Sequence, residues 1–160
     1  MVTKAKVKVK ELMTTDVIAF KPSDKIQQVA ETFRVNRISG APVIDDQRRV
    51  IGVISEADIM KLTATIPFPD IDPLNPFPVF SLSAYMKQVR DIQEEIATLF
   101  EGEVKDVMSR KPVTISPEDS ISNAARIMRK NDFNRIPVVD ADGKLVGLIA
   151  RDDIIGVFAR

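Results

Sequence analysis

The chain contains the stretch Gly52-Val53-Ile54-Ser55-Glu56-Ala57-Asp58, which returns 95 positions later as Gly147-Leu148-Ile149-Ala150-Arg151-Asp152-Asp153. Both stretches end a longer internal repeat, because residues 9–60 align with residues 104–155 without a gap. The identical pairs include Met13/Met108, Pro22/Pro117, Asp24/Asp119, Ile26/Ile121, Ala30/Ala125, Asn36/Asn131, Pro42/Pro137, Gly52/Gly147 and Asp58/Asp153. A unit of about fifty residues that occurs twice is typical of folds in which one copy cannot bury its apolar face alone. The region between the copies is therefore the first place to look for function.

Each copy predicts the same order of elements. Apolar residues recur at helical spacing at Ile26, Val29, Ala30 and Phe33, and again at Ile121, Ala124, Ala125 and Met128. The second copy precedes this helix with Ser116-Pro117-Glu118-Asp119, a typical helix start, whereas Lys21-Pro22-Ser23-Asp24 lacks the capping residue. Two β-branched runs and a second helix follow, and we place them at residues 42–44, 50–54 and 55–62 in the first copy and at 137–139, 145–149 and 152–158 in the second. The predicted unit is β-α-β-β-α, and the fold class is α+β.

The segment between the copies has a different composition. Pro67, Pro69, Pro73, Pro76 and Pro78 exclude a regular helix or central strand there. From residue 81 to residue 101 an amphipathic linker helix is predicted by the spacing of Tyr85, Val89, Ile92, Ile96 and Leu99. We therefore divide the chain into an N-terminal strand or tail (1–8), a first repeat (9–64), a proline-rich loop with a linker helix (65–103) and a second repeat (104–160).

Composition excludes several classes of function. The 160 residues suit one compact domain, and 23 basic against 23 acidic residues leave no broad field for nucleic-acid or membrane binding. There is no Cys and no His, so thiol nucleophiles, imidazole bases and the usual zinc ligands are missing. We expect no enzyme and no metal site, and a hydrolase that uses carboxylates and a metal is the remaining catalytic alternative. Without a leader or a long apolar run, the expected location is cytoplasmic.

The paired motifs resemble the cystathionine-beta-synthase (CBS) domain, which occurs as tandem pairs. The resemblance rests on Val9-Lys10-Glu11-Leu12-Met13, Ala41-Pro42-Val43-Ile44-Asp45 and the stretch 52–58, each with its counterpart in the second copy. It implies two repeats packed sheet to sheet about a pseudo-twofold axis, and commonly a homodimer. It also implies a regulatory module with no obligatory cofactor, which senses AMP, ADP, ATP or S-adenosylmethionine in clefts between the repeats.

The resemblance implies two ligand sites. The first combines Ser55, Ala57 and Asp58 with Thr114, Ile115, Ser116, Phe133, Asn134 and Arg135. A carboxylate such as Asp58 accepts the hydroxyls of a ribose, the Ser55 hydroxyl suits a phosphate oxygen, and the apolar surroundings of Phe133 suit adenine.

The second site combines Ala19, Lys21, Ile38, Ser39 and Gly40 with Ala150, Arg151, Asp152 and Asp153. Here the sequence departs from the family pattern, because Ala150 replaces the usual hydroxyl and Asp152 adds a negative charge. Arg151 and Lys21 offset that charge or are simply solvated. We predict that this site binds more weakly, or prefers a ligand with less phosphate charge.

The sequence allows two alternatives. Ser55-Glu56-Ala57-Asp58 is also a capping box, and taken alone that is the interpretation we favour. Because Asp58 and Asp153 persist in both copies and the capping residue does not, a dual role in capping and binding is preferred. The other alternative is an interaction module with vestigial clefts, which docks an unidentified protein through residues 65–101. Phe68, Phe77 and Phe80 in this segment either form an exposed patch for the partner or pack against the body of the protein.

Overall fold

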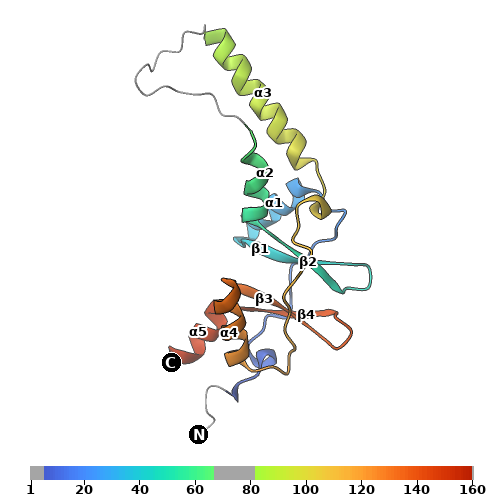
Figure 1. Ribbon diagram of the computed structural model, residues 1–160, viewed down its shortest axis with the longest axis vertical. Helices are drawn as coiled ribbons and strands as arrows, with labels where there is room; N and C mark the ends of the chain where they lie inside the picture. The colour runs from blue at the N-terminus through green and yellow to red at the C-terminus, as the bar shows by residue number, and fades with distance from the viewer. Residues whose placement is uncertain (1–5, 67–81, 160) are drawn as a thin grey trace. The chain divides into compact units, whose positions relative to one another are not determined.

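The order of elements repeats, as the sequence predicts (Figure 1). The computed structural model describes residues 6–66 and 82–159, with no account of the side chains of 82–85. The first copy contains α1 (Ile26–Asn36), β1 (Gly40–Ile44), β2 (Val50–Ser55) and α2 (Glu56–Thr63). The second contains α4 (Ile121–Asn131), β3 (Arg135–Val139), β4 (Leu145–Ala150) and α5 (Arg151–Phe158). The copies begin with two short 3-10 turns, η2 (Val9–Glu11) and η3 (Val104–Asp106), and the linker helix between them is α3 (Leu82–Phe100).

The two compact units of the chain do not coincide with the two copies. Unit 1 comprises Met1–Pro22, Ala41–Ile54 and Ser109–Arg160, and unit 2 comprises Ser23–Gly40 and Ser55–Met108. Each copy therefore contributes to both units.

Unit 1 contains both hairpins and the larger apolar core. The strands β3 and β4 pair antiparallel, with Arg135 opposite Ala150 and Ile136 opposite Ile149. Inward-facing residues of these strands meet the apolar stripe of α4, as alternation and helical spacing predict. The buried cluster consists of Val9, Ile115, Ile121, Ala124, Met128, Ile136, Val138, Ile149 and Ile154.

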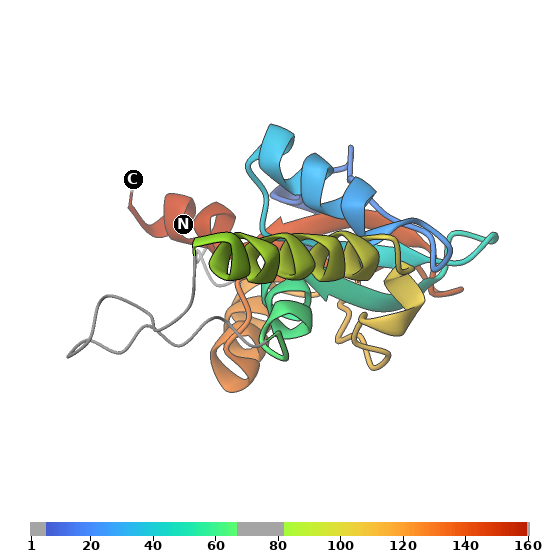
Figure 2. The same ribbon diagram turned by 90° about the horizontal axis from the view of Figure 1, so that it is seen from above.

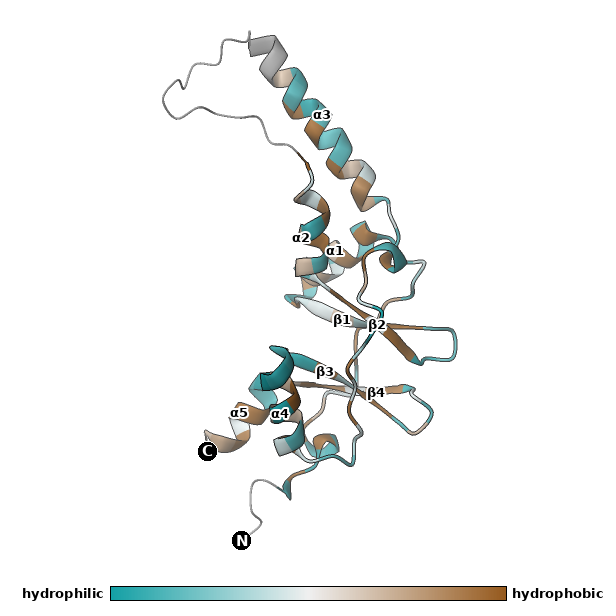
Figure 3. Ribbon diagram, viewed as in Figure 1, coloured by the Kyte–Doolittle hydropathy of each residue, from teal (hydrophilic) through white to brown (hydrophobic). Residues whose placement is uncertain are grey.

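Unit 2 is helical, and α3 contacts both α1 and α2 (Figures 1 and 2). The hydropathy of α3 alternates along its length, which confirms the predicted amphipathic linker helix (Figure 3). Its apolar positions Val89, Ile92, Ile96 and Leu99 are half-buried. The prolines 67–78 and the three phenylalanines proposed as a docking patch lie outside the described residues.

Backbone hydrogen bonds join the hairpins of the two copies at their turns. Val50 N–H donates to Gly143 O over 3.1 Å, and Leu145 N–H donates to Arg48 O over 2.9 Å. Positions 48 and 143 correspond in the repeat, as do 50 and 145. Exchanging the copies therefore exchanges the two bonds, as a twofold relation between the turns requires.

The segment that begins each copy pairs with the other copy. Thr14 and Leu148 exchange two backbone bonds of 2.9 Å, and the corresponding pair Ser109 and Val53 exchanges bonds of 2.9 and 3.0 Å. The start of α4 is bonded in the same way, since Ile121 N–H donates to Val7 O over 2.9 Å. In unit 2 the corresponding bond runs from Ile26 to Gly102, also over 2.9 Å. Neither copy completes its hydrogen bonding alone.

Two details of the sequence prediction are wrong, because the first segment of each copy pairs with the other copy. The first element of each repeat is not a continuous strand, because residues 8 and 14 make isolated bridges on either side of the turn η2. Helix α4 begins at Ile121 with Ser120 as its N-cap, and Ser116 caps no helix. Ser120 forms a bridge with Lys8, so the backbone of Ser120 is extended. The first helical residue is therefore Ile121, directly after Ser120.

Gly147 allows the first segment of the first copy, at Met13 and Thr14, to lie close to β4. A Cβ atom at this position would lie 2.6 Å from Met13 Sδ and 3.0 Å from Thr14 O. Distances this short require either the side chain of Met13 or the backbone at Thr14 to move.

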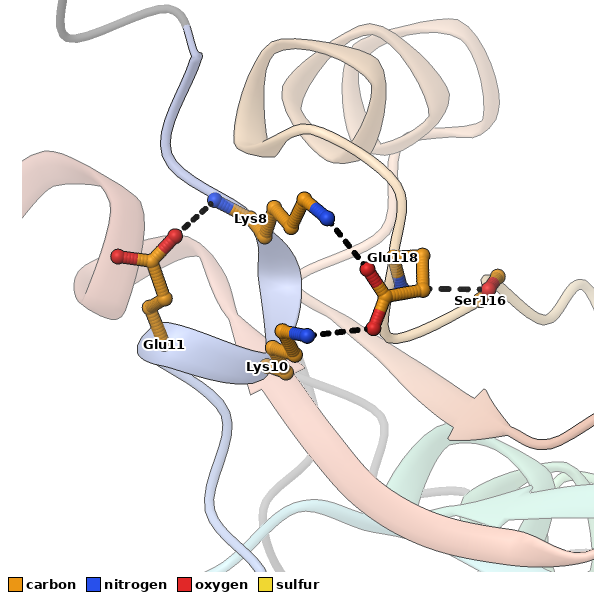
Figure 4. Close-up of polar contacts among 5 residues, drawn as sticks. All are labelled: Lys8, Lys10, Glu11, Ser116 and Glu118. Carbon is orange, nitrogen blue, oxygen red and sulfur yellow. Dashed lines mark hydrogen bonds and ion pairs between the residues drawn. The ribbon is translucent and has the colours of Figure 1, made fainter. Parts of the chain in front are cut away.

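Glu118 forms ion pairs with Lys8 and Lys10, which lie in the first segment of the first copy (Figure 4). The ammonium group of Lys10 donates to Oε1 over 2.6 Å, and that of Lys8 donates to Oε2. These two bonds lower the pKa of Glu118 from 4.5 to about 2, and the bond that Lys8 donates to Glu118 raises the pKa of Lys8. All three side chains are exposed, so salt weakens the cluster.

We predict that Gly147→Ala destabilises the protein by about 1–3 kcal/mol, because the new methyl group overlaps the exchanged segment. Gly156→Ala is the matched control, since nothing lies within 4 Å of a Cβ there and the residue is inside α5. Removing a glycine from a helix interior should raise stability by about 0.5–1 kcal/mol. Urea unfolding measures both values, and equal effects of the two substitutions would contradict the close approach.

Glu118→Gln should lower the free energy of unfolding in a pH-dependent way. Because the folded pKa lies below the unfolded one, the stabilisation is complete above about pH 5 and disappears as the pH falls towards 2. The difference between wild type and variant should therefore be constant from pH 6 to 9, shrink below about pH 4.5, and shrink in high salt. Glu95→Gln is the control, since Glu95 belongs to no ion pair within the described residues. A difference independent of pH would argue against the cluster.

Candidate functional site

The residues of both expected sites are divided between the units. For the first site, Ser55, Ala57 and Asp58 lie in unit 2, and residues 114–116 and 133–135 lie in unit 1. For the second site, residues 38–40 lie in unit 2, and the others lie in unit 1. The structure therefore defines the local geometry of each group.

The first group lies where β2 passes directly into α2. Ser55 is the N-cap and has extended backbone, with φ −129° and ψ 165°. Its N–H and hydroxyl both donate to Oδ2 of Asp58, over 2.8 and 2.9 Å, and Asp58 N–H donates back to Ser55 Oγ over 3.3 Å. The predicted capping box is confirmed. Both side chains are half-buried, and Ala57 is exposed.

Ser39, which the sequence assigns to the second site, is bonded to this junction. The N–H of Glu56 donates to Ser39 O over 2.9 Å. Ile38 follows Arg37, a residue in the left-handed conformation with φ 54°, and its N–H donates to Phe33 O over 3.1 Å. This turn ends α1 and leads through Gly40 into β1.

The corresponding junction of the second copy joins β4 to α5 and differs at one position. Ala150 N–H donates to Oδ2 of Asp153 over 2.8 Å, but alanine has no hydroxyl to cap the helix. Asp153 is half-buried and Asp152 is exposed. The carboxylate therefore keeps one of the two bonds that Ser55 gives to Asp58.

Arg151 connects residues assigned to different sites. Its backbone N–H donates to Asn134 O over 2.8 Å, and its guanidinium donates to Phe133 O over 3.1 Å. Phe133 follows the left-handed Asp132 and keeps 38% of its surface exposed. Arg135 begins β3 opposite Ala150. Sequence reasoning missed the Arg151 contact, because a bond from a side chain to a distant carbonyl leaves no pattern in the sequence.

Residues 114–116 follow the edge of β3. Ile115 N–H donates to Pro137 O over 3.1 Å, Val139 N–H donates to Ile115 O over 3.0 Å, and the Ile115 side chain is only 3% exposed. Ile115 therefore serves the core, whereas Thr114 is half-buried and Ser116 is exposed. The hydroxyl oxygen of Ser116 accepts from Glu118 N–H over 3.2 Å (Figure 4).

Ala19 and Lys21 lie beside the edge of β1, as residues 114–116 lie beside the edge of β3. Between them, Phe20 N–H donates to Pro42 O over 3.0 Å, and Phe20 accepts from Ile44 N–H over 2.8 Å. The ammonium group of Lys21 lies 3.0 Å from Asp46 Oδ1, and both side chains are exposed. An aspartate thus partly neutralises the lysine.

Across residues 6–66 and 82–159, no three acidic side chains are grouped so as to hold a metal ion. No helix in that part of the chain is long and apolar enough to cross a membrane.

The duplicated hairpin and helix, with a carboxylate at the same place after the second strand of each hairpin, define a tandem pair of small α+β repeats. The CBS domain family matches residues 9–64 and 104–160, and the chain belongs to this family.

Relatives of known sequence support the assignment. The uncharacterised protein MJ1426 of Methanocaldococcus jannaschii is 34% identical over 150 residues, which are 92% of this chain and 88% of the relative. The chloroplastic CBS domain-containing protein CBSX2 of Arabidopsis thaliana is 30% identical over 143 residues, 84% of this chain and 56% of CBSX2.

Solved structures share the fold. The crystal structure of CBSX2 in complex with AMP is 26% identical, with a TM-score of 0.70 over 95% of this chain and 96% of that one. The CBS domain of a membrane protein from Sphaerobacter thermophilus is 27% identical, with the same TM-score over 96% and 88%.

We predict opposite effects of exchanging residues between the two junctions. Ser55→Ala removes the N-cap of α2 and should cost about 1 kcal/mol, whereas Ala150→Ser gives α5 a cap and should add up to about 1 kcal/mol. Each substitution is the control for the other, because both positions have extended backbone. Urea unfolding measures the two values. Destabilisation by Ala150→Ser would show that the second junction cannot accept a capping hydroxyl.

Proposed function

We propose that the chain is a regulatory module without catalytic activity that senses an adenosine-containing ligand, namely AMP, ADP, ATP or S-adenosylmethionine. The observation that carries the proposal is the doubled junction of strand and helix, with half-buried Asp58 and Asp153 at equivalent positions. Membership of the CBS family and the likeness to CBSX2, which was crystallised with AMP, add independent support.

For the first site we propose that Asp58 and Ser116 supply polar groups and that Phe133 supplies an apolar contact, as the pattern of the CBS family implies. An ionised carboxylate accepts both hydroxyls of a ribose, and the exposed ring of Phe133 suits an adenine face. The remaining members are Ser55, Ala57, Thr114, Ile115, Asn134 and Arg135.

The second site comprises Ala19, Lys21, residues 38–40 and residues 150–153, and we propose that it binds more weakly. Asp153 receives one bond fewer than Asp58, and exposed Asp152 repels phosphate. The two basic residues are already engaged, Lys21 with Asp46 and Arg151 with Phe133 O.

A ligand regulates only if it binds one arrangement of the protein more tightly than another. The reciprocal bonds between the two turns make the packing of the copies a suitable element to shift. We further propose that the chain forms a homodimer. Met60 on α2 and Ile155 on α5 occupy equivalent positions, and both are more than half exposed.

We propose that the chain has no catalytic activity. The sequence has no His and no Cys, and so lacks the commonest bases and nucleophiles. We also propose that the chain is cytoplasmic and has no nucleic-acid or membrane partner. The balanced charge, 23 basic against 23 acidic residues, supports the absence of such partners.

A second candidate function is docking of a protein partner by the insert. The observation that favours it is α3, whose apolar stripe is only half-buried and whose Met86 is 55% exposed. An amphipathic helix with an incompletely covered face is a common docking element.

Thermal unfolding with AMP, ADP, ATP and S-adenosylmethionine at millimolar concentrations tests the main proposal. At a hundredfold excess over Kd, one site stabilises by about 2.7 kcal/mol, or roughly 5–10 °C for a domain of this size. Asp58→Ala should remove most of the shift, and Asp153→Ala a smaller part. Light scattering of the same samples should give the mass of two chains.

Three outcomes would argue against it. No stabilisation by any adenosyl compound would leave the sensing function without support. Partner binding that is unchanged by AMP and by the double Asp58→Ala, Asp153→Ala variant would favour the interaction module. Turnover of ATP in the presence of magnesium would identify an enzyme.

A further inference from the structure

The charged side chains of α3 form two blocks of opposite sign. Residues 82–90 include Lys87 and Arg90 and no acid, whereas residues 91–100 include Asp91, Glu94 and Glu95 and no base. All five side chains are exposed, and within residues 6–66 and 82–159 none of them takes part in an ion pair. The first four share one face of the helix, which lies opposite the half-buried apolar stripe, and we call it the outer face of α3.

Interactions within the helix do not explain this order of charges. The helix dipole favours acids towards the N-terminus and bases towards the C-terminus, and α3 has the opposite order. Lys87 precedes Asp91 by four residues, as Arg90 precedes Glu94, and this spacing allows ion pairs between successive turns. Neither pair is formed in the part of the chain that the structure describes. The charges of the outer face are therefore available to another molecule.

The outer face is complementary in charge to an antiparallel copy of itself. When residues 82–99 of two antiparallel helices overlap, Lys87 lies opposite Glu94 of the second copy, and Arg90 lies opposite Asp91 of the second copy. The twofold axis between the helices makes each contact occur twice. A parallel pair would instead place Lys87 opposite Lys87 and Glu94 opposite Glu94. Charge complementarity therefore indicates a second copy, in the antiparallel orientation, as the occupant of this face.

The ends of the outer face suit close approach of two helices. Beyond the charged residues, positions 83 and 84 are Ser and Ala, and positions 97 and 98 are Ala and Thr. In the same antiparallel overlap, position 84 lies opposite 97 and position 83 lies opposite 98. The distance between two packed helices depends on the side chains at the contact, so small residues at both ends let the longer charged side chains between them meet.

We propose that the outer face of α3 pairs antiparallel with the same face of a second copy, about a twofold axis that passes between residues 90 and 91. This inference rests on the proposed homodimer and assigns one of its contacts. The face is separate from the apolar stripe of α3, which is the surface considered above for a different protein.

The consequence concerns the orientation of the two chains more than their affinity. Exposed ion pairs each contribute little to binding, and salt screens them. Like charges that meet in the parallel arrangement are unfavourable, so the same residues exclude that arrangement. The contact therefore selects how two chains meet in the homodimer, and it weakens as the salt concentration rises.

Analytical ultracentrifugation of the full chain over a dilution series at low salt tests the pairing. Lys87→Glu places like charges together on both sides of the axis and should weaken the dimer roughly five- to tenfold, and Glu94→Lys should have the same effect. The double variant Lys87→Glu, Glu94→Lys restores opposite charges and should dimerise like the wild type. A mixture of the two single variants should form a dimer that contains one chain of each. Salt at about 1 M should remove these differences.

Lys111→Glu is the matched control. It changes the net charge by the same amount at an exposed residue outside the helices and strands, and it should leave the dimer unchanged. Contact between the two helices can also be detected directly with a carbodiimide, which joins an amine and a carboxylate by an amide bond with loss of water. In a mixture of isotope-labelled and unlabelled wild-type chains, it should link Lys87 of one chain to Glu94 of the other.

Several results would overturn the pairing. Equal weakening by Lys111→Glu would attribute the effect to net charge, and failure of the double variant to recover would show that Lys87 and Glu94 do not meet. A dimer that neither reversal weakens would leave the proposed homodimer intact and exclude the outer face from it. A single chain at every concentration would overturn the homodimer as well. Sensing of an adenosyl ligand is tested separately by thermal unfolding, so its failure is distinguishable from all of these results.

Discussion

Pairing of each copy's first segment with the other copy is the constraint on which the rest of the structure depends. Thr14 pairs with Leu148 and Ser109 pairs with Val53, each through two backbone bonds. The same segments bond to the residues that precede α4 and α1. A single copy would leave these backbone groups without partners, and buried backbone groups are seldom left unpaired. Duplication is therefore a requirement of the fold, and Gly147 is needed because the exchanged segment lies against it.

The duplication also places one aspartate at the junction of strand and helix in each copy. In each copy, the second strand of the hairpin passes directly into a helix, and the third helical residue is an aspartate. The first N–H of each helix donates to a carbonyl that follows the preceding helix, which is Ser39 O for α2 and Asn134 O for α5. The carboxylates are thus held on rigid elements, which is the usual basis of precise recognition.

Because the two junctions are nearly symmetric, the differences between them are informative. Ser55 and Ala150 differ by a single oxygen, and the carboxylates beside them differ by a single hydrogen bond. Arg151 adds a second difference, because its guanidinium bonds to Phe133 O and so connects residues assigned to separate sites. Two junctions that arose from one repeat thus differ in their hydrogen bonds, while the backbone at both N-cap positions stays extended.

By itself, the sequence determined the repeat, the α+β class, the hairpins, the linker helix and the Ser55-Asp58 capping box. Each of these depends on side-chain spacing or on residues a few positions apart, so a local pattern reports it. The tertiary structure alone decided that the first segments are exchanged, that α4 starts at Ile121 rather than near Ser116, and that Ile115 belongs to the core. It also decided that the Ser55 proton is given to Asp58. The exchange escapes prediction because it uses backbone N–H and C=O groups, which every residue except proline carries in full and which leave no mark in the sequence.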